Sequence, residues 1–435
     1  MNVYKKFLGT IASVMLIMAA NGAQAETLQE AVKFMLLSNP EVRAQSYNRM
    51  AKGKEVRQAK AGYLPTIDVT AGLGFDRQHQ PFYDTTYPHS TKISIRQNVF
   101  RFFGTQSEVE RQEARVKSQA YLLQGTSENN ALLAARSYLN VLRYQELHTL
   151  AQENLANHQR ILDQVKLRSE SGIDRKADLD QVMGRLALAQ SNITAAEANL
   201  ADANSDYLAI IGHLPGELVK PDDAGSALPG TLEEAEQLAI KNNPIVKSSK
   251  ADIEARKSQH ETAKSQLYPS LDVAMDYKWE KDVAIPGKQS GFLAMGIISF
   301  NIFNGGWNRA RIGQTALEMY EAEEISNNAT RQAVQSVRLS WEAYKATKER
   351  AISLEEYAKS AGMTAEAFAA QWNIGRRTMF DLLDTQAEHI NARASLTNVK
   401  YDKLIAEYRI LSVMAKLIPH LGLPLPEQSI VPMEK

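Results

Sequence analysis

The segment Thr27-Leu28-Gln29-Glu30-Ala31 recurs with one change as Thr231-Leu232-Glu233-Glu234-Ala235, which lies 204 positions later (231 − 27). The dipeptide Asn39-Pro40 returns as Asn243-Pro244 at the same offset (243 − 39). Ordered identities at a fixed spacing indicate an internal duplication, and such a repeat constrains the fold more than any local propensity does.

The second half of each repeat keeps the register with an offset of 203. Gly172 matches Gly375 and Asp178 matches Asp381. The sequence therefore predicts five segments: a leader (1–25), a first repeat (26–215), a linker (216–230), a second repeat (231–418) and a short tail (419–435). Each repeat is expected to fold into the same order of elements.

The first 25 residues have the pattern of a cleavable export signal. Two lysines precede the apolar stretch Phe7–Ala20, and Ala23-Gln24-Ala25 supplies the small residues of a cleavage site. An uncleaved membrane anchor is the alternative, but the apolar run is shorter than the ~18–20 residues that a spanning helix needs.

Each repeat contains a long stretch without proline, from Pro88 to Pro215 and from Pro286 to Pro419. Because proline breaks helix interiors, both stretches are free to be helical. Gly172 and Gly375 interrupt them, and glycine favours helix ends. We expect two helical hairpins, each with one arm longer than about 60 residues.

A period of two precedes each hairpin, which is typical of strands with one apolar face. Residues 66–75 and 271–279 alternate in this way, and a second strand is expected near 92–100 and 291–303. The loops Arg77–Ser90 and Lys281–Ser290 connect the pairs. A soluble sandwich remains possible, but strand length, terminal aromatic residues and the export signal favour a membrane barrel. Four strands cannot enclose a pore, so several chains are required.

Composition excludes several classes of protein. The 50 basic and 50 acidic residues balance, which argues against a nucleic-acid partner. No cysteine is present, so disulfides, thiolate metal sites and a lipid-modified cysteine are excluded. The eight histidines lack the spacing of a metal site, and no nucleophile, phosphate-loop or dinucleotide motif occurs. We predict neither an enzyme nor a cofactor.

The order helix, strand, strand, long helix, turn, helix, repeated after an export signal, resembles the TolC-like outer membrane factor family. The most specific segment is 372–384, Trp-Asn-Ile-Gly-Arg-Arg-Thr-Met-Phe-Asp-Leu-Leu-Asp, which is similar to the family's second periplasmic hairpin tip. Gly172 and Asp178 match the first tip. Trp372 departs from the pattern, because the best-known member has a tyrosine there, and tryptophan has no hydroxyl group.

The resemblance implies an α+β membrane protein that forms a homotrimer. Four strands from each chain would build one 12-stranded β-barrel in outer-membrane lipid, and the helical hairpins would form a periplasmic α-barrel. Asp178, Trp372, Arg377, Asp381 and Asp384 would form the periplasmic constriction, with Arg377 and Asp178 as a closing ion pair. Independent surface charges are the alternative for these residues.

The resemblance also implies partners. Gly172, Ile173, Ile374 and Gly375 at the hairpin tips would dock a periplasmic adaptor, which in turn binds an inner-membrane transporter. We expect an ATP-driven (ABC) transporter of a type I protein secretion system, because many drug-efflux members carry the lipidation cysteine that this chain lacks. A drug or metal efflux pump driven by protons is the alternative. A periplasmic coiled-coil adaptor is an alternative of another class.

Overall fold

The computed structural model describes residues 25–78, 84–171, 175–283 and 285–431. The predicted leader, apart from Ala25, and the tip residues Gly172 and Ile173 lie outside these ranges. The chain divides into two compact units. The first comprises the described residues of Met1–Arg43, Gln124–Asn243 and Ala333–Pro426, and the second those of Ala44–Leu123, Pro244–Gln332 and Glu427–Lys435.

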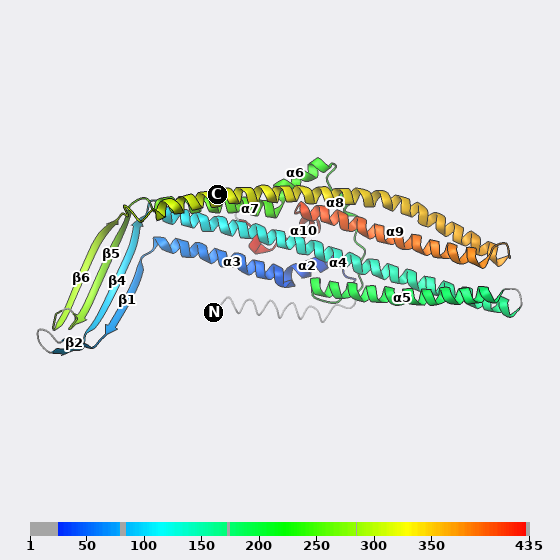
Figure 1. The fold of residues 1–435 in the computed structure, drawn as a ribbon, viewed down its shortest axis with the longest axis horizontal. Coiled ribbons are helices and arrows are strands. Elements are labelled where there is room, and N and C mark those ends of the chain that lie inside the picture. Colours follow the sequence, from blue (N-terminus) through cyan, green and yellow to red (C-terminus); the bar gives the residue numbers. More distant parts are fainter. Residues whose placement is uncertain (1–24, 79–83, 172–174, 284, 432–435) are drawn as a thin grey trace. The chain divides into compact units, whose positions relative to one another are not determined.

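The helices recur with the offsets that the sequence predicted (Figure 1). The first repeat contains α2 (Leu28–Ser38), α3 (Pro40–Lys60), α4 (Gly104–Glu170) and α5 (Lys176–Ile211); the second contains α6 (Leu232–Asn242), α7 (Pro244–Ser265), α8 (Trp307–Asn373) and α9 (Met379–Val413). Short elements are α10 (Leu417–His420) and the 3-10 turns η1 (Ala61–Tyr63), η2 (Ala224–Ala227) and η3 (Glu427–Ser429). Both α4 and α8 have 67 residues, which confirms the predicted long arms.

The repeated pentapeptide is a helix start in both halves. The Thr27 hydroxyl accepts a hydrogen bond from the backbone N–H of Glu30, and the Glu30 carboxylate accepts one from the Thr27 backbone, which forms a capping box. Thr231 caps α6 in the same way, accepting from the backbone of Glu234 at 3.2 Å. Proline then opens the next helix of each repeat, where its missing N–H is not needed.

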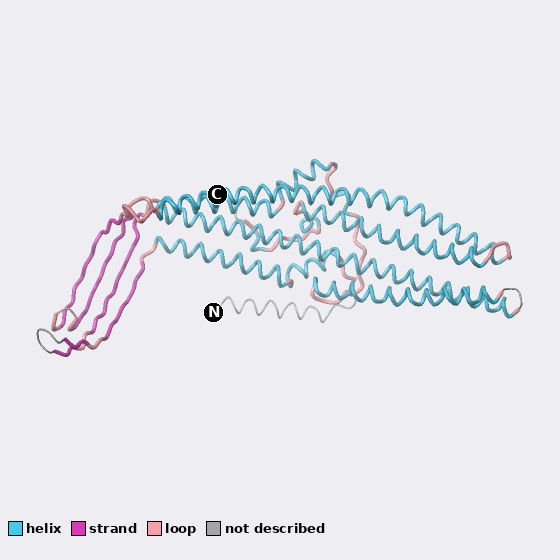
Figure 2. The backbone as a smooth tube through the Cα atoms, in the orientation of Figure 1, coloured by secondary structure: helices cyan, strands magenta, loops and turns pink. Residues whose placement is uncertain are grey.

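The second unit contains a four-stranded antiparallel sheet in the order β1–β4–β5–β6 (Figure 1). Its strands are β1 (Thr66–Leu73), β4 (His89–Phe100), β5 (Ser270–Lys281) and β6 (Lys288–Ser299). β4 from the first repeat pairs with β5 from the second, with Ile93 opposite Tyr277. One sheet is therefore built from both halves of the chain, and β1 and β6 are its edges. The predominantly helical chain with this sheet confirms the predicted α+β fold class (Figure 2).

The prediction of a loop at Arg77–Ser90 was partly wrong. Strand β2 (Asp76–Gln78) pairs with β3 (Asp84–Thr86), and β4 already begins at His89. Backbone pairing continues beyond the apolar alternation, here between residues with polar side chains such as Asp76 and Thr86. Because the strand ends were predicted from apolar alternation, this polar part of the hairpin was not expected.

The sheet leaves large apolar side chains exposed in a single chain. Ile67, Val69 and Leu73 of β1 are 66%, 69% and 91% exposed, and Phe292 of β6 is 69% exposed. Large apolar side chains exposed on both edge strands are typical of a surface that meets lipid or protein. No described helix is both long and apolar enough to cross a membrane.

In the first unit, the linker is tied to α9 by charged groups. The fully buried carboxylate of Glu407 accepts a hydrogen bond from the backbone N–H of Ala224 at 3.1 Å. Lys403 contacts Asp223 and lies 3.4 Å from Glu407. Burial, together with the neighbouring Asp223, raises the pKa of Glu407 to about 7.

Candidate functional site

The turn between α8 and α9 lies in the first unit and contains the predicted second tip. α8 ends in a Schellman motif, in which the Gly375 N–H bonds the Trp372 carbonyl and the Arg376 N–H bonds the Gln371 carbonyl, each at 2.9 Å. Gly375 has φ +74°, a left-handed conformation that costs residues with a Cβ atom. The glycine that the sequence placed at this turn is therefore required by the backbone.

The next helix, α9, begins with a capping box. The Thr378 hydroxyl donates to the Asp381 carboxylate at 2.8 Å and accepts from the Asp381 N–H at 3.2 Å. Hydrogen bonds from the hydroxyl and the backbone N–H of Thr378 hold the pKa of Asp381 below its usual range. Asp381 is thus ionised at neutral pH, and one of its roles is to fix the start of the helix.

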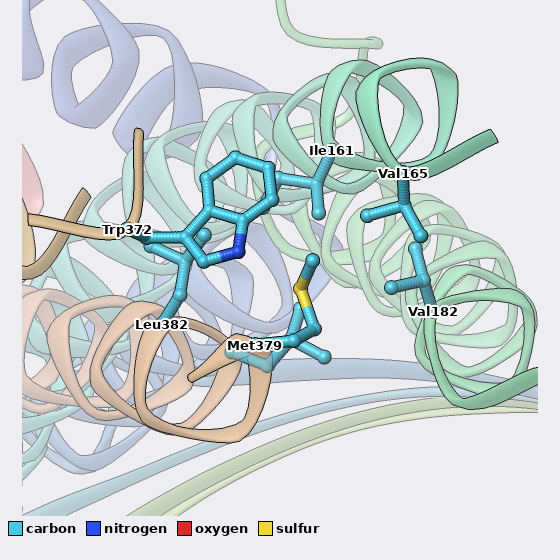
Figure 3. Packing of buried hydrophobic residues seen from close by; sticks show 7 residues of the cluster. Ile161, Val165, Val182, Trp372, Met379 and Leu382 are labelled. Atoms are coloured by element: carbon cyan, nitrogen blue, oxygen red, sulfur yellow. The ribbon is translucent and has the colours of Figure 1, made fainter. Parts of the chain in front are cut away.

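Trp372 packs inside the chain (Figure 3). It is 5% exposed and lies in a cluster of buried residues from both hairpins. The other members of this cluster are Ile161, Val165, Val182, Met379, Leu382 and Leu383. The Arg168 guanidinium lies 5.1 Å from the centre of the Trp372 ring, a cation–π distance. The indole therefore joins the end of the second hairpin to the end of the first.

Arg377 is held by its own hairpin. Its guanidinium lies 4.0 Å from the ring centre of Phe368, donates to the Gln371 side chain at 2.9 Å and lies 3.9 Å from the Asp381 carboxylate. The Arg377 side chain nevertheless remains 39% exposed. Among the described residues of one chain, the structure shows no ion pair between Arg377 and Asp178. A pair between copies stays a prediction.

The other two predicted carboxylates have different partners. Asp178 accepts from the backbone N–H of Arg175 at 3.2 Å, so it sits at the start of α5 as its repeat equivalent, Asp381, sits at the start of α9. Asp384 pairs with Arg185 of α5 at 2.8 Å and remains 67% exposed. The sequence analysis missed Arg185, since nothing in the linear spacing brings α5 beside α9.

This region combines charged side chains with a packed apolar cluster. In the described part of the chain, no three histidine, aspartate or glutamate side chains are grouped to hold a metal ion. The tip instead offers carboxylate and guanidinium groups set at helix ends. Such groups attract or repel charged solutes and form breakable contacts with neighbours.

Comparison with known proteins places this arrangement in a family. The family model described as outer membrane efflux protein matches residues 31–213 and 236–416, one segment in each repeat. The chain belongs to the outer membrane efflux protein family. The members that it resembles are channels and not enzymes.

Relatives match over nearly the whole chain. The outer membrane protein TolC of Escherichia coli is 25% identical over 438 residues, covering 95% of this chain and 87% of that protein. The outer membrane efflux protein BepC of Brucella suis is 22% identical over 406 residues, with 92% and 88% covered. The proteases secretion protein PrtF of Dickeya chrysanthemi is 22% identical over 431 residues, with 90% and 88% covered.

A solved structure supports the fold. The outer membrane channel CmeC of Campylobacter jejuni superposes with a TM-score of 0.77 at 14% identity, covering 90% of this chain and 86% of that one. In this outer membrane efflux protein, the residues predicted to dock a partner at the second tip are accessible. Ile374 is 66% exposed and Phe380, which the sequence analysis did not select, is 57% exposed.

Proposed function

We propose that three copies of this chain form a channel for export across the outer membrane. The observation that carries the proposal is the four-stranded sheet. In the described part of the chain its edge strands, β1 and β6, each pair on one side only, and apolar side chains are exposed on its surface. Unpaired backbone groups are very costly in lipid. Edge pairing of β6 of one copy with β1 of the next removes both open edges at once.

The tips of the helical hairpins form the periplasmic constriction in this proposal. Asp381 and Asp384 repeat as rings of three carboxylates by symmetry, and Arg377 of one copy meets Asp178 of its neighbour. Support comes from the exposure of Arg377 and Asp384 in a single chain, because a contact between copies needs groups that remain accessible.

The tips also bind the proposed partners. A periplasmic adaptor docks on the turns that carry Ile374 and Gly375 and their equivalents Gly172 and Ile173, and it links the channel to an inner-membrane transporter. The exposed apolar side chain of Ile374 supports this docking, since an accessible apolar side chain on a rigid helix end suits a protein partner. The leader is removed during export, so the mature chain starts at Glu26.

The transported substrate is a secreted protein in this proposal, delivered by an ABC transporter of a type I system. Similarity to the proteases secretion protein PrtF over 90% of this chain supports it. Drug or metal efflux by a proton-driven pump is the second candidate, supported by similarity to the efflux protein BepC over 92% of the chain.

Two measurements test these proposals. The purified chain in detergent should have the native mass of a trimer, and a stable monomer would contradict the channel. Deletion of the gene should remove one or a few large proteins from the culture medium and leave drug and metal tolerance unchanged. The opposite result, an unchanged set of secreted proteins with lost tolerance, would favour the efflux candidate.

A further inference from the structure

A groove with a volume of about 620 Å³ lies in the second unit and is lined by residues of α3, α4 and α7. Helix α3 contributes Arg49, Gly53 and Val56, whose spacings of four and three place them on one helix face. Helix α4 contributes small apolar residues such as Ala114 and Ala120. The groove therefore combines an apolar surface with charged groups along its walls.

The chain itself reaches this groove. Val431, the last residue that the structure describes, lines it together with the three helices. Residues 427–431 also belong to the same compact unit as these helices. The sequence continues with Pro-Met-Glu at 432–434, and three residues of extended chain span at most ~11 Å. These residues therefore begin at the groove and are within reach of its walls.

One wall of the groove holds a guanidinium group with an unused donor. The Nε of Arg49 is buried, and no described residue accepts a hydrogen bond from it. The other basic residue that lines the groove, Lys117, already pairs with Glu254 at 3.2 Å. A buried donor without an acceptor is costly, so Arg49 favours an acceptor that enters the groove.

We propose that residues 432–434 lie in the groove of their own chain, with the Glu434 carboxylate bound to Arg49 and the Met433 side chain packed against Val56. The segment then acts as a strap that joins α3 of the first repeat to α7 of the second. This inference concerns a single chain and does not depend on the proposed trimer.

The chemistry of the three residues suits the groove. Pro432 has no backbone N–H, so its burial leaves no donor unpaired. Met433 has a flexible apolar side chain, which fills irregular gaps between helices. A carboxylate such as that of Glu434 forms strong, charge-assisted hydrogen bonds with a guanidinium group. The volume of the groove falls within the ~300–1,000 Å³ of sites that bury small ligands, which is enough for a short peptide segment.

The same chain is a better occupant than a separate protein. Because Val431 already lies at the groove, the residues after it are held there at an effective concentration on the order of millimolar. A separate peptide with the same contacts would have to displace this segment and would also lose its freedom of movement on binding.

A cysteine pair tests the placement in a chain that has no cysteine of its own. Gly53 can accept a side chain, because the nearest atom to an added Cβ is the Arg49 Nη1 at 4.0 Å. Oxidation of Gly53→Cys with Met433→Cys should form a disulfide within one chain, detected as a linked peptide from the monomer band of a denaturing gel. The matched control is Ala51→Cys with Met433→Cys. Ala51 lies about 160° around α3 from Gly53 and should give at least tenfold less of the bond.

The outcomes are decisive for the strap and separate from the channel. A bond in the Gly53 pair and not in the Ala51 pair supports the strap. No bond in the Gly53 pair, or equal yields in the two pairs, overturns it. A bond that joins two chains also overturns it, because the proposal places the segment in its own groove. The native mass of the same protein tests the proposed trimer independently.

Charge reversal tests the contact with Arg49. In the protein with the Gly53 and Met433 cysteine pair, Arg49→Glu should lower the yield of the bond at least threefold, because it places two carboxylates together. Lys52→Glu changes the charge of α3 by the same amount at a residue that does not line the groove, and should leave the yield unchanged. Adding Glu434→Arg to Arg49→Glu should restore the bond. An unchanged yield in Arg49→Glu, or no recovery in the double reversal, would overturn the contact between Arg49 and Glu434.

Discussion

Replacing Trp372 by alanine tests whether the two hairpin tips act as one packed body. The indole is 5% exposed and lies in one cluster with buried residues from α4, α5 and α9 (Figure 3). A buried tryptophan removes ~200 Å² of surface from water, which corresponds to about 5 kcal/mol at ~25 cal/mol per Å². Part of this remains with the alanine, so we expect a loss of about 3–5 kcal/mol, in the range of other large-to-small changes.

The loss should appear as local opening of the tip. Hydrogen exchange reports the free energy of such opening, and 1.4 kcal/mol corresponds to a factor of ten. Amides in a peptide spanning 379–390 should therefore exchange at least about a hundredfold faster in Trp372→Ala, in the native trimer and at constant pH. Amides of α2, which lie outside this cluster, should keep their rates.

Two controls make the result interpretable. Phe380→Ala removes an aromatic residue that is 57% exposed in the first turn of α9, and should change exchange less than threefold. Trp372→Phe keeps a ring in the cluster and should give an intermediate rate. Equal exchange in Trp372→Ala and the unaltered protein would refute the view that this residue joins the tips.

The remaining predictions concern charge. Arg377→Ser or Asp178→Ala should raise single-channel conductance without reducing the amount of trimer. The double variant should raise conductance little further, because both changes break the same contact; fully additive effects would show that the two residues are not partners. Asp381→Ala with Asp384→Ala should weaken cation selectivity and block by multivalent cations in planar bilayers, and full block in this variant would place the constriction elsewhere. Glu407→Gln should remove a pH dependence of the free energy of unfolding. Folding raises the pKa of the Glu407 carboxyl from 4.5 to about 7, so the free energy of unfolding falls by about 3 kcal/mol as pH rises between these two values. Thermal melts at pH 4.5 and 8 should therefore differ less in the Gln variant, and an identical difference in both proteins would exclude Glu407 as the cause.

The positions of the helices could be predicted from the sequence because the repeat constrains them twice. α4 and α8 begin and end exactly 203 positions apart, and one proline-free stretch confirms the other. Alternation located the strands but not their ends: β2 and β3 extend the first hairpin with polar residues, and β6 runs from Lys288 to Ser299 where a strand near 291–303 was expected. Local patterns were sufficient where one face of an element differs chemically from the other.

The contacts at the hairpin tips were harder to predict, because these residues have partners from distant segments. Trp372 was expected at the closed mouth, and the structure adds a second role that only the packing of α4 and α5 against α9 reveals. The Arg185–Asp384 pair joins residues 199 positions apart in the sequence. Such contacts depend on how the two hairpins are brought together, and no local spacing encodes that.

The duplication also separates structural from functional charge at the tips. Asp178 and Asp381 are equivalent residues, and both accept a hydrogen bond from the backbone at a helix start. A carboxylate at this position caps the helix whether or not it also faces a pore. Asp384 has no such capping role: its repeat equivalent is Gln181, and its partner is the side chain of Arg185. A change in ion selectivity on replacing Asp384 alone is therefore the cleaner evidence for a carboxylate ring, whereas loss of Asp381 also disturbs the helix that presents it.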